Sequence, residues 1–267
     1  MILPKRDTAL KLFLAGGTVG PVVDSLHNQC LLKYDIAPIS IPWTSDVFAS
    51  TGIDTSFAPA YFFCSSWLIP PLLGAAYVVL GGILPALFRS VENAAPFPDS
   101  DTGNFSQSIK GADTLSILRT KGLLAVTTTA MIILLSEFLQ THSEVVDGSE
   151  AKFLIMLSAA IVQWLLLDGT KAALLVAVVT SVGGPLSELP FVAHGCWHYL
   201  PPAADYLPLS GSTLSGFGES ALRWFLGENY RDLSLSSITG PCYFAVTMDA
   251  IALGRWFDSD VQVEELP

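Results

Sequence analysis

Two long apolar runs separated by a short polar step dominate this sequence. The first run, FLIMLSAAIVQWLLL, ends at Leu167, and the second, AALLVAVVTSVGGPLS, begins at Ala172. Each run has about 15 to 17 residues, near the short end of what a helix rising about 1.5 Å per residue needs to cross a hydrocarbon layer of about 30 Å. The pattern therefore predicts a transmembrane hairpin whose turn is formed by Asp168, Gly169, Thr170 and Lys171.

The composition agrees with a membrane protein. Hydrophobic residues make up 51% of the chain and charged residues only 14%, whereas about a quarter of the residues in ordinary soluble domains carry charge. The net charge is −11 and the 13 basic residues are scattered. Nucleic-acid binding requires clustered Lys and Arg, so a nucleic-acid partner is not expected.

The apolar runs predict an all-α fold, a polytopic membrane bundle of six transmembrane helices in a single domain. A long outer loop is expected over 188–237, with an acidic tail at 257–267. Within that loop, 218–230 (GESALRWFLGENY) is typical of a short amphipathic helix at the membrane interface. The six expected spans are 8–23, 61–88, 118–138, 152–167, 172–186 and 238–256.

The distribution of basic residues predicts the orientation of these spans. Six crossings place nine Lys and Arg on the side of both termini and four on the other. The positive-inside rule then places both termini and the Asp168 turn in the cytosol. Asn104 lies in a glycosylation sequon, Asn-Phe-Ser, on that same side, so we expect it to stay unmodified.

Glycine and proline interrupt the second and fifth expected spans. In lipid, the backbone groups that they disturb must find partners on neighbouring helices, so these segments are expected to face protein. The simplest interpretation is that these spans are kinked helices that pack against their neighbours. In the first span, Gly16 and Gly20 predict a close approach between helices. A second interpretation is the adjustable wall of a lipid groove, formed by Trp67, Pro70, Pro71, Gly74, Gly183, Gly184 and Pro185.

Ionisable residues near the membrane are the other candidates for function. Glu137 and Glu188 fall at expected helix ends, where solvated carboxylates are common. Asp249 lies a dozen residues into the last span and should need a polar neighbour from another helix. Together, Asp249 and Glu137 could form a polar intramembrane site, which keeps a small-solute transporter or channel as an alternative function.

Asp168 allows two interpretations from the sequence alone. As a turn residue before Gly169 it can cap a helix end through side-chain hydrogen bonds. As a carboxylate at the cytosolic edge it can instead bind a partner.

Metal-binding and catalytic patterns are sparse. His194, Cys196 and His198 lie within five residues, but no further ligand pair recurs at zinc-like spacing. HExxH and nucleophile-elbow motifs are absent. The sequence therefore predicts no metal, no cofactor and no enzymatic activity. Four cysteines fall on or near the outer side, where disulfides and reduced buried thiols are both compatible with the sequence: Cys30, Cys64, Cys196 and Cys242.

Three stretches of the chain resemble the Insig (insulin-induced gene) family. CSSWLIPPLLGAAYVVLGGILPALF, 64–88, is similar to the second span of that family. VQWLLLDGTKAALLVAVV resembles the end of its fourth span, where a tryptophan precedes an aspartate-containing turn. SSITGPCYFAVTMDAIALGRWF resembles its last span. The resemblance covers the six-span skeleton and about half of the chain.

The resemblance implies an endoplasmic-reticulum membrane protein with cytosolic termini that regulates sterol homeostasis. Insig proteins bind oxysterols and retain sterol-sensing-domain membrane proteins, notably the escort protein Scap and HMG-CoA reductase. The family's aspartate at the cytosolic end of the fourth span corresponds to Asp168, which the resemblance assigns to partner binding. Gly169 stands where the family has a basic residue, and the loop over 188–237 is longer than its counterpart.

Overall fold

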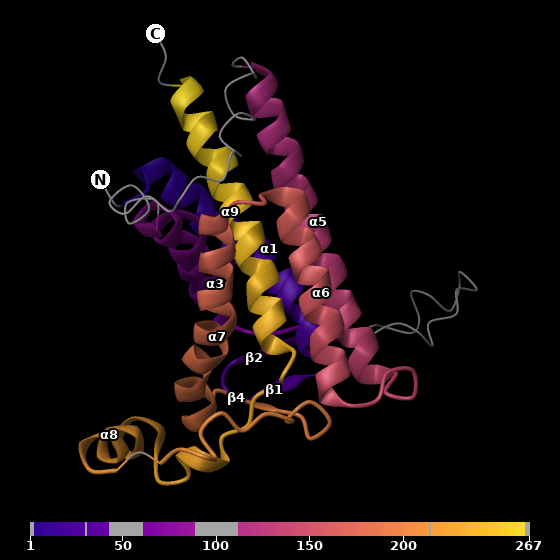
Figure 1. Ribbon diagram of the computed structural model, residues 1–267, viewed down its shortest axis with the longest axis vertical. Coiled ribbons are helices and arrows are strands. Elements are labelled where there is room, and N and C mark those ends of the chain that lie inside the picture. Colours follow the sequence, from indigo (N-terminus) through magenta and orange to yellow (C-terminus); the bar gives the residue numbers. More distant parts are fainter. Residues whose placement is uncertain (1–2, 30, 43–60, 89–111, 214, 265–267) are drawn as a thin grey trace.

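A computed structural model describes residues 3–29, 31–42, 61–88, 112–213 and 215–264, and within these ranges the chain forms a helical membrane bundle (Figure 1). The predicted all-α fold class is confirmed. Helix α3 (Ile69–Val78) continues through a π-helical turn, η1 (Val79–Ile83), to Phe88. The other long helices are α1 (Arg6–Asn28), α5 (Ala112–Thr141), α6 (Ser149–Leu167), α7 (Lys171–Ala193) and α9 (Thr239–Glu264).

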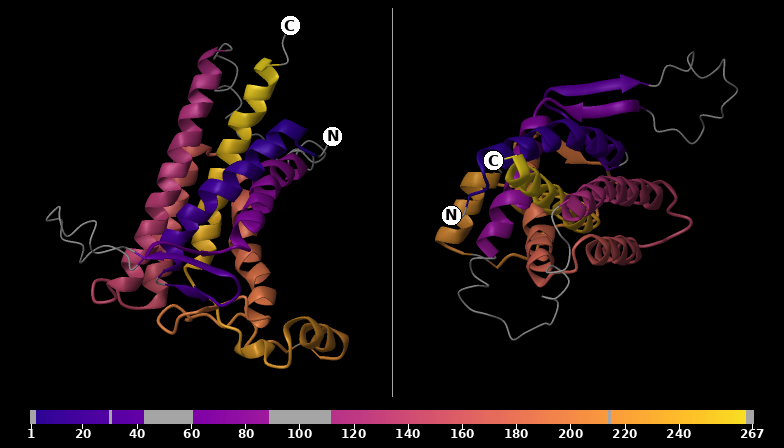
Figure 2. Two further views of the ribbon diagram at one scale, coloured as in Figure 1. Left: turned by 180° about the vertical axis from the view of Figure 1, so that it is seen from behind. Right: turned by 90° about the horizontal axis from the view of Figure 1, so that it is seen from above.

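Helix α9 occupies the centre of the bundle. It packs against α1, α3, α5, α6 and α7, and the view from above shows it surrounded by them (Figure 2). Its side chains from Phe244 to Leu253 include fully buried Ala245, Met248 and Ala250. Burial by protein on every side explains why this helix can carry polar groups that a lipid-facing helix would expose at high cost.

The surrounding helices have the composition of membrane spans. Five of them are long and apolar enough to cross a bilayer: Arg6–Asn28, Ile69–Phe88, Leu115–Thr141, Ser149–Leu167 and Lys171–Ala193. Their outward faces carry exposed aliphatic side chains such as Leu123, Leu165 and Val182, which are about 60% exposed within the chain. Soluble monomers rarely expose so large an apolar surface to water, so the bundle is an integral membrane protein.

Several element boundaries differ from the sequence prediction. The second span begins at Ile69, because Tyr61–Ser66 form a β-strand, β3. Helix α7 extends to Ala193, so the first part of the expected outer loop is helical. The acidic segment after Phe257 continues α9 to Glu264. The sequon at Asn104 lies outside the described residues.

Two small antiparallel sheets close the end of the bundle that lies opposite the last turns of α9 (Figure 1). β1 (Leu32–Tyr34) pairs with β4 (Trp197–Tyr199), and β2 (Pro38–Pro42) pairs with β3. The β1–β4 pair connects the first long loop with the last one, although they are far apart in the sequence. Both sheets pair backbone groups outside the helices, and the β1–β4 pair holds Tyr34, Trp197 and Tyr199 at this end of the bundle.

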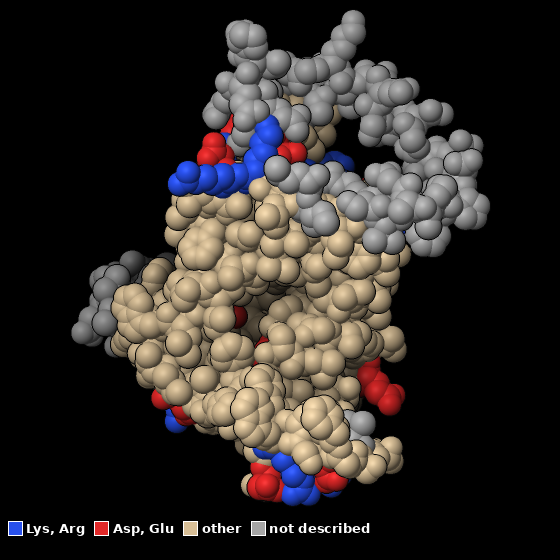
Figure 3. Space-filling view, turned by 90° about the vertical axis from the view of Figure 1, so that its left-hand side faces the viewer, with Lys and Arg blue, Asp and Glu red and all other residues tan. Residues whose placement is uncertain are grey.

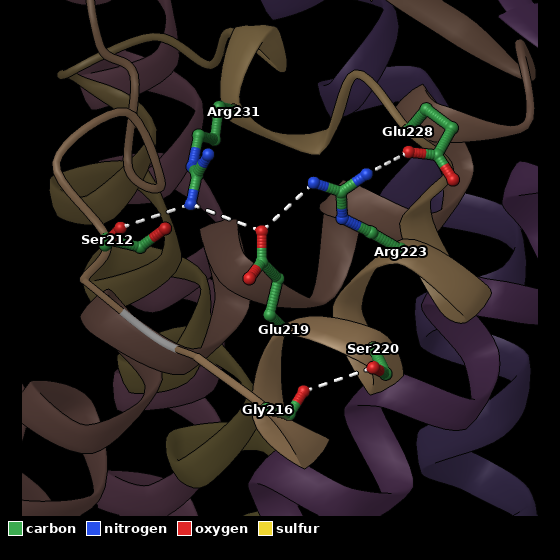
Figure 4. Close-up of polar contacts among 7 residues, drawn as sticks. All are labelled: Ser212, Gly216, Glu219, Ser220, Arg223, Glu228 and Arg231. Carbon is green, nitrogen blue, oxygen red and sulfur yellow. Dashed lines mark hydrogen bonds and ion pairs between the residues drawn. The ribbon is translucent and has the colours of Figure 1, made fainter.

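The predicted amphipathic segment is a helix, α8 (Phe217–Leu226), at the same end as the sheets. One face exposes Phe217 and Trp224, which are 91% and 86% exposed. The other carries a polar network in which Glu219 accepts from Arg223 at 3.0 Å and pairs with Arg231 at 3.6 Å (Figure 4). An aromatic face beside a charged face is the arrangement that lies in a membrane interface, and this placement stays a prediction.

The closest approach between helices joins η1 to α9. A Cβ atom added at Gly254 would clash with the carbonyl oxygen of Gly81, and one added at Gly81 would clash with the carbonyl oxygen of Ala250. Backbone therefore touches backbone on both sides of this contact. Only glycine fits such a contact, which is typical of small-residue interfaces in membrane bundles.

This contact predicts a contrast between two glycine substitutions. Gly254→Ala should lower the free energy of unfolding by about 1–3 kcal/mol, because two rigid backbones must separate. Gly183→Ala is the control, since an added Cβ at Gly183 meets nothing within 4 Å. Thermal unfolding of the purified variants in one detergent measures the difference, and equal melting temperatures would contradict the packing described here.

Candidate functional site

A cavity of about 240 Å³ lies inside the bundle, between α1, α3, α5, α7 and α9 and above the β1–β4 pair. Its walls are largely apolar, with Leu73, Ile133, Phe191 and Val246 among the lining side chains. In Figure 3 a hollow opens in the uncharged middle band of the molecule, between the charged groups at its two ends, and acidic atoms are visible at its base. Its opening therefore faces the hydrocarbon layer rather than water.

Two acidic side chains, Asp24 and Glu188, line this cavity. Asp24 comes from the last turn but one of α1, where its Oδ2 accepts a hydrogen bond from the Tyr34 hydroxyl at 2.7 Å. That hydroxyl accepts in turn from the Asn28 amide at 2.6 Å. Because Asn28 follows Asp24 by four residues, both side chains lie on one face of the helix, where Tyr34 of β1 meets them.

Glu188 enters the cavity from α7, on the opposite side. Its Oε2 accepts from the hydroxyl of Tyr199 at 2.6 Å, and Tyr199 lies 3.2 Å from the Thr239 hydroxyl at the start of α9. Neither carboxylate of the cavity has a salt bridge within the described residues. Each is held by neutral donors, so the charge of both is uncompensated by protein cations.

The two tyrosines remain protonated donors over the physiological pH range. Burial raises the pKa of Tyr34 well above its usual value, and the Asp24 carboxylate adds to this shift. Burial likewise raises the pKa of Tyr199, with a further contribution from Glu188. Both effects disfavour the phenolate, which would be a buried anion next to a carboxylate.

The sequence did not identify either cavity carboxylate as part of a site. Asp24 follows the expected end of the first span by one residue, and Glu188 was assigned to a solvated helix end. The sequence feature that could have indicated a polar site is the close spacing of Asp24, His27 and Asn28 on one helical face. Their tertiary partners, Tyr34 and Tyr199, come from loops whose pairing the sequence does not reveal.

Six residues of the predicted lipid-groove wall lie on α3 and α7, and Trp67 lies in the turn before α3. None of its seven residues lines the 240 Å³ cavity, and of the seven only Pro185 borders a second cavity, between α6, α7 and α9. Gly74 packs against Phe13, Gly184 against the ring of Tyr243, and Trp67 is 70% exposed. Gly74 and Gly184 therefore serve close helix packing, whereas an added Cβ at Gly183 meets nothing within 4 Å. Pro70 and Pro71 lie in the first turn of α3, where proline costs no hydrogen bond.

Asp249 has the polar neighbour that the sequence predicted. It is 2% exposed, and its Oδ2 accepts from the Tyr77 hydroxyl of α3 at 2.5 Å. Tyr77 also lines the cavity, so this bond connects the cavity wall to the central helix. Glu137 is half-buried on α5. Neither Asp249 nor Glu137 lines either described cavity, so these cavities do not join the two into a polar path.

The Tyr77–Asp249 bond predicts a measurable loss of stability. Tyr77→Phe leaves the buried carboxylate without its donor and should lower the free energy of unfolding by about 1–3 kcal/mol. Tyr206→Phe, at a side chain that is 48% exposed, should change it little. Unfolding in detergent compares the two variants, and an unchanged stability of Tyr77→Phe would show that the bond is dispensable.

Asp168 forms both the cap and an ion pair. Its Oδ1 accepts from the backbone N–H of Thr170 at 2.9 Å and from the Thr170 hydroxyl. Its Oδ2 lies 2.5 Å from the guanidinium of Arg255 on α9. The carboxylate is only 3% exposed, whereas Arg255 is 43% exposed. The turn is therefore fixed to the central helix, and the exposed charge at this point belongs to Arg255.

Other basic groups gather at the end of the bundle that carries the Asp168 turn. Lys11 lies 2.9 Å from Asp260 and Arg119 lies 3.2 Å from it. The ammonium of Lys121 donates to the carbonyl oxygen of Leu167 at 2.9 Å, at the carboxyl end of α6. The first turn of α1 and the last turns of α9 lie at this end too (Figure 1).

The histidine and cysteine residues serve other contacts in the described chain. His198 Nδ1 lies 2.6 Å from a carboxylate oxygen of Asp35. Cys64 and Cys196 are free thiols, and Cys30 is not among the described residues. Over the residues that the structure describes, no three His, Cys, Asp or Glu side chains gather as a metal site would require.

Comparison with known proteins identifies the fold. No family model and no curated protein matches this sequence. Among solved structures, the chain is similar to the mycobacterial Insig homolog MvINS from Mycobacterium vanbaalenii, with a TM-score of 0.54, 16% identity and 96% of each chain covered. A cross-linked trimeric variant of MvINS gives a TM-score of 0.56 and 17% identity over 99% of this chain and 98% of that one. The architecture is therefore Insig-like, as the sequence resemblance implied.

Proposed function

We propose that this Insig-like membrane protein binds a sterol or another lipid in the cavity beside Asp24 and Glu188. The observation that carries the proposal is a cavity within the bundle that opens in its uncharged band. A lipid can enter such a cavity directly from the bilayer, with its apolar part against Leu73 and Phe191 and its polar group against the hydrogen-bonded end.

The same lipid is proposed to control retention of a membrane partner, such as a sterol-sensing-domain protein of the endoplasmic reticulum. A ligand shifts partner association only by the difference between its affinities for the free and the associated states. The cavity wall connects a bound lipid to the central helix, since Tyr77 lines the cavity and also donates a hydrogen bond to Asp249 of α9. Arg255 follows Asp249 on that helix and reaches the Asp168 turn.

We propose a regulatory and non-enzymatic role for the site. Each cavity carboxylate accepts from a tyrosine of the strands below, and the lining residues supply no pair of groups arranged as nucleophile and base. The tyrosine hydroxyls fix the carboxylates in place, which suits recognition of a polar group.

Filling the cavity with a larger side chain should weaken lipid binding. Ala76 lines the cavity, whereas Ala75 is its exposed neighbour on the same helix. Ala76→Trp should reduce the affinity for a radiolabelled oxysterol at least about tenfold, which corresponds to about 1.4 kcal/mol. Ala75→Trp is the matched control and should bind as the unsubstituted chain does. Equal binding by both variants, measured on purified protein in detergent, would place the lipid elsewhere.

Partner retention should depend on the Asp168–Arg255 pair. We expect Arg255→Ala to reduce capture of a sterol-sensing-domain partner as strongly as Asp168→Ala, because each variant releases the turn from the central helix. Arg223→Ala is the control, since that arginine is also 43% exposed but lies on α8 at the other end. Co-purification from membranes gives the readout. Capture that survives both substitutions would remove this pair from the partner surface.

A further inference from the structure

The charges of the cavity limit the head group that it can accept. Asp24 and Glu188 line it together, and Asp24 is close enough to act electrostatically on Glu188. The described residues that line the cavity include no Lys and no Arg. Two carboxylates in an apolar enclosure without a cation ionise only at a cost, and pairing with a cation would offset that cost.

The neutral donors already present do not supply this charge. Tyr34 donates to one oxygen of Asp24. Tyr199 donates to Glu188, which also accepts from Tyr243. Both side chains keep accessible surface although they lie deep in the bundle, as expected for groups that face a cavity. Their remaining acceptor sites therefore point to a ligand that donates hydrogen bonds.

A further donor lies in the same cavity, next to Glu188. The side chain of Trp197 is 5% exposed and lines the cavity, and its indole N–H makes no hydrogen bond of ordinary geometry within the described residues. This N–H lies close enough to Glu188 to act as a weak donor to that carboxylate. It can donate to an oxygen atom of a ligand held beside that carboxylate.

We propose that the cavity selects a long-chain amino alcohol, an amphiphile with a protonated amine beside a hydroxyl group. The ammonium lies between Asp24 and Glu188 and supplies the missing positive charge, and the hydroxyl oxygen accepts from Trp197. This inference rests on the proposed lipid site and specifies the head group that the site recognises. Anionic head groups, such as a phosphate or a fatty-acid carboxylate, meet two like charges and are rejected.

The size of the cavity suits a head group with part of its chain. Its 240 Å³ is below the roughly 300–1,000 Å³ of pockets that enclose a whole drug-sized ligand. The remainder of the chain then extends through the opening into the bilayer, next to exposed aliphatic side chains of the bundle.

The test compares three ligands with one chain length on the purified full chain in detergent. Radiolabelled 2-aminooctadecanol, octadecanol and octadecanoate are measured by equilibrium binding. We expect the amino alcohol to bind best and octadecanoate worst. Asp24→Asn and Glu188→Gln should each weaken amino-alcohol binding about tenfold while changing octadecanol binding less than about threefold. Glu137→Gln is the control, because this carboxylate lies on α5 outside the cavity.

The outcomes separate this inference from the proposed function. If octadecanol or an oxysterol binds as tightly as the amino alcohol, and Asp24→Asn and Glu188→Gln change nothing, the head-group assignment is overturned while lipid binding stands. Preferred binding of octadecanoate also overturns it. If none of the lipids binds and Ala76→Trp has no effect, the lipid site itself fails. Because the Asn and Gln variants keep the size of each side chain, a melting temperature measured alongside shows that they fold.

Discussion

The structure depends on one buried helix, α9, against which the five other long helices pack. A helix enclosed by protein does not need a lipid-compatible surface, so it can be selected for close packing and for polar contacts. Gly254 lets it meet the backbone of η1, Thr247 lies 2.7 Å from the Thr180 hydroxyl of α7, and Asp249 accepts from Tyr77. These contacts cross to α7 and to the continuous helix formed by α3 and η1, so α9 fixes the relative positions of elements that surround the cavity.

The cavity exists where this packing is incomplete. Helix α3 packs on α1 and helix α7 packs on α9, and the space between these pairs is closed from below by the β1–β4 sheet. The sheet places Tyr34, Trp197 and Tyr199 at the base, next to Asp24 of α1 and Glu188 of α7. The polar end of the cavity therefore combines strand and helix residues, and the apolar walls come from helices. A polar end and apolar walls give the cavity the amphipathic character that a lipid head group and its chain require.

Much of the bundle could be predicted from the sequence, because apolar runs in lipid can only become helices. The central carboxylate Asp249 and its need for a partner followed from the same cost of burial, and Gly16 does allow the predicted close approach, since it contacts Leu73 and Tyr77 of α3. The strand over Tyr61–Ser66 was missed because its aromatic residues continue the apolar run that follows. The predicted groove-wall residues do not line the 240 Å³ cavity, because glycine and proline mark close packing as readily as open space. Their role in a groove wall stays a prediction.

Mapping a photoactivatable lipid on the folded protein tests the central claim, that a lipid occupies the cavity through its lateral opening. The label should attach to cavity residues on several elements, such as Val23 of α1, Leu73 of α3 and Phe191 of α7, and excess unlabelled lipid should compete with it. Labelling confined to outward side chains such as Leu165 and Val182, without competition, would show that lipid only surrounds the bundle and would contradict this account.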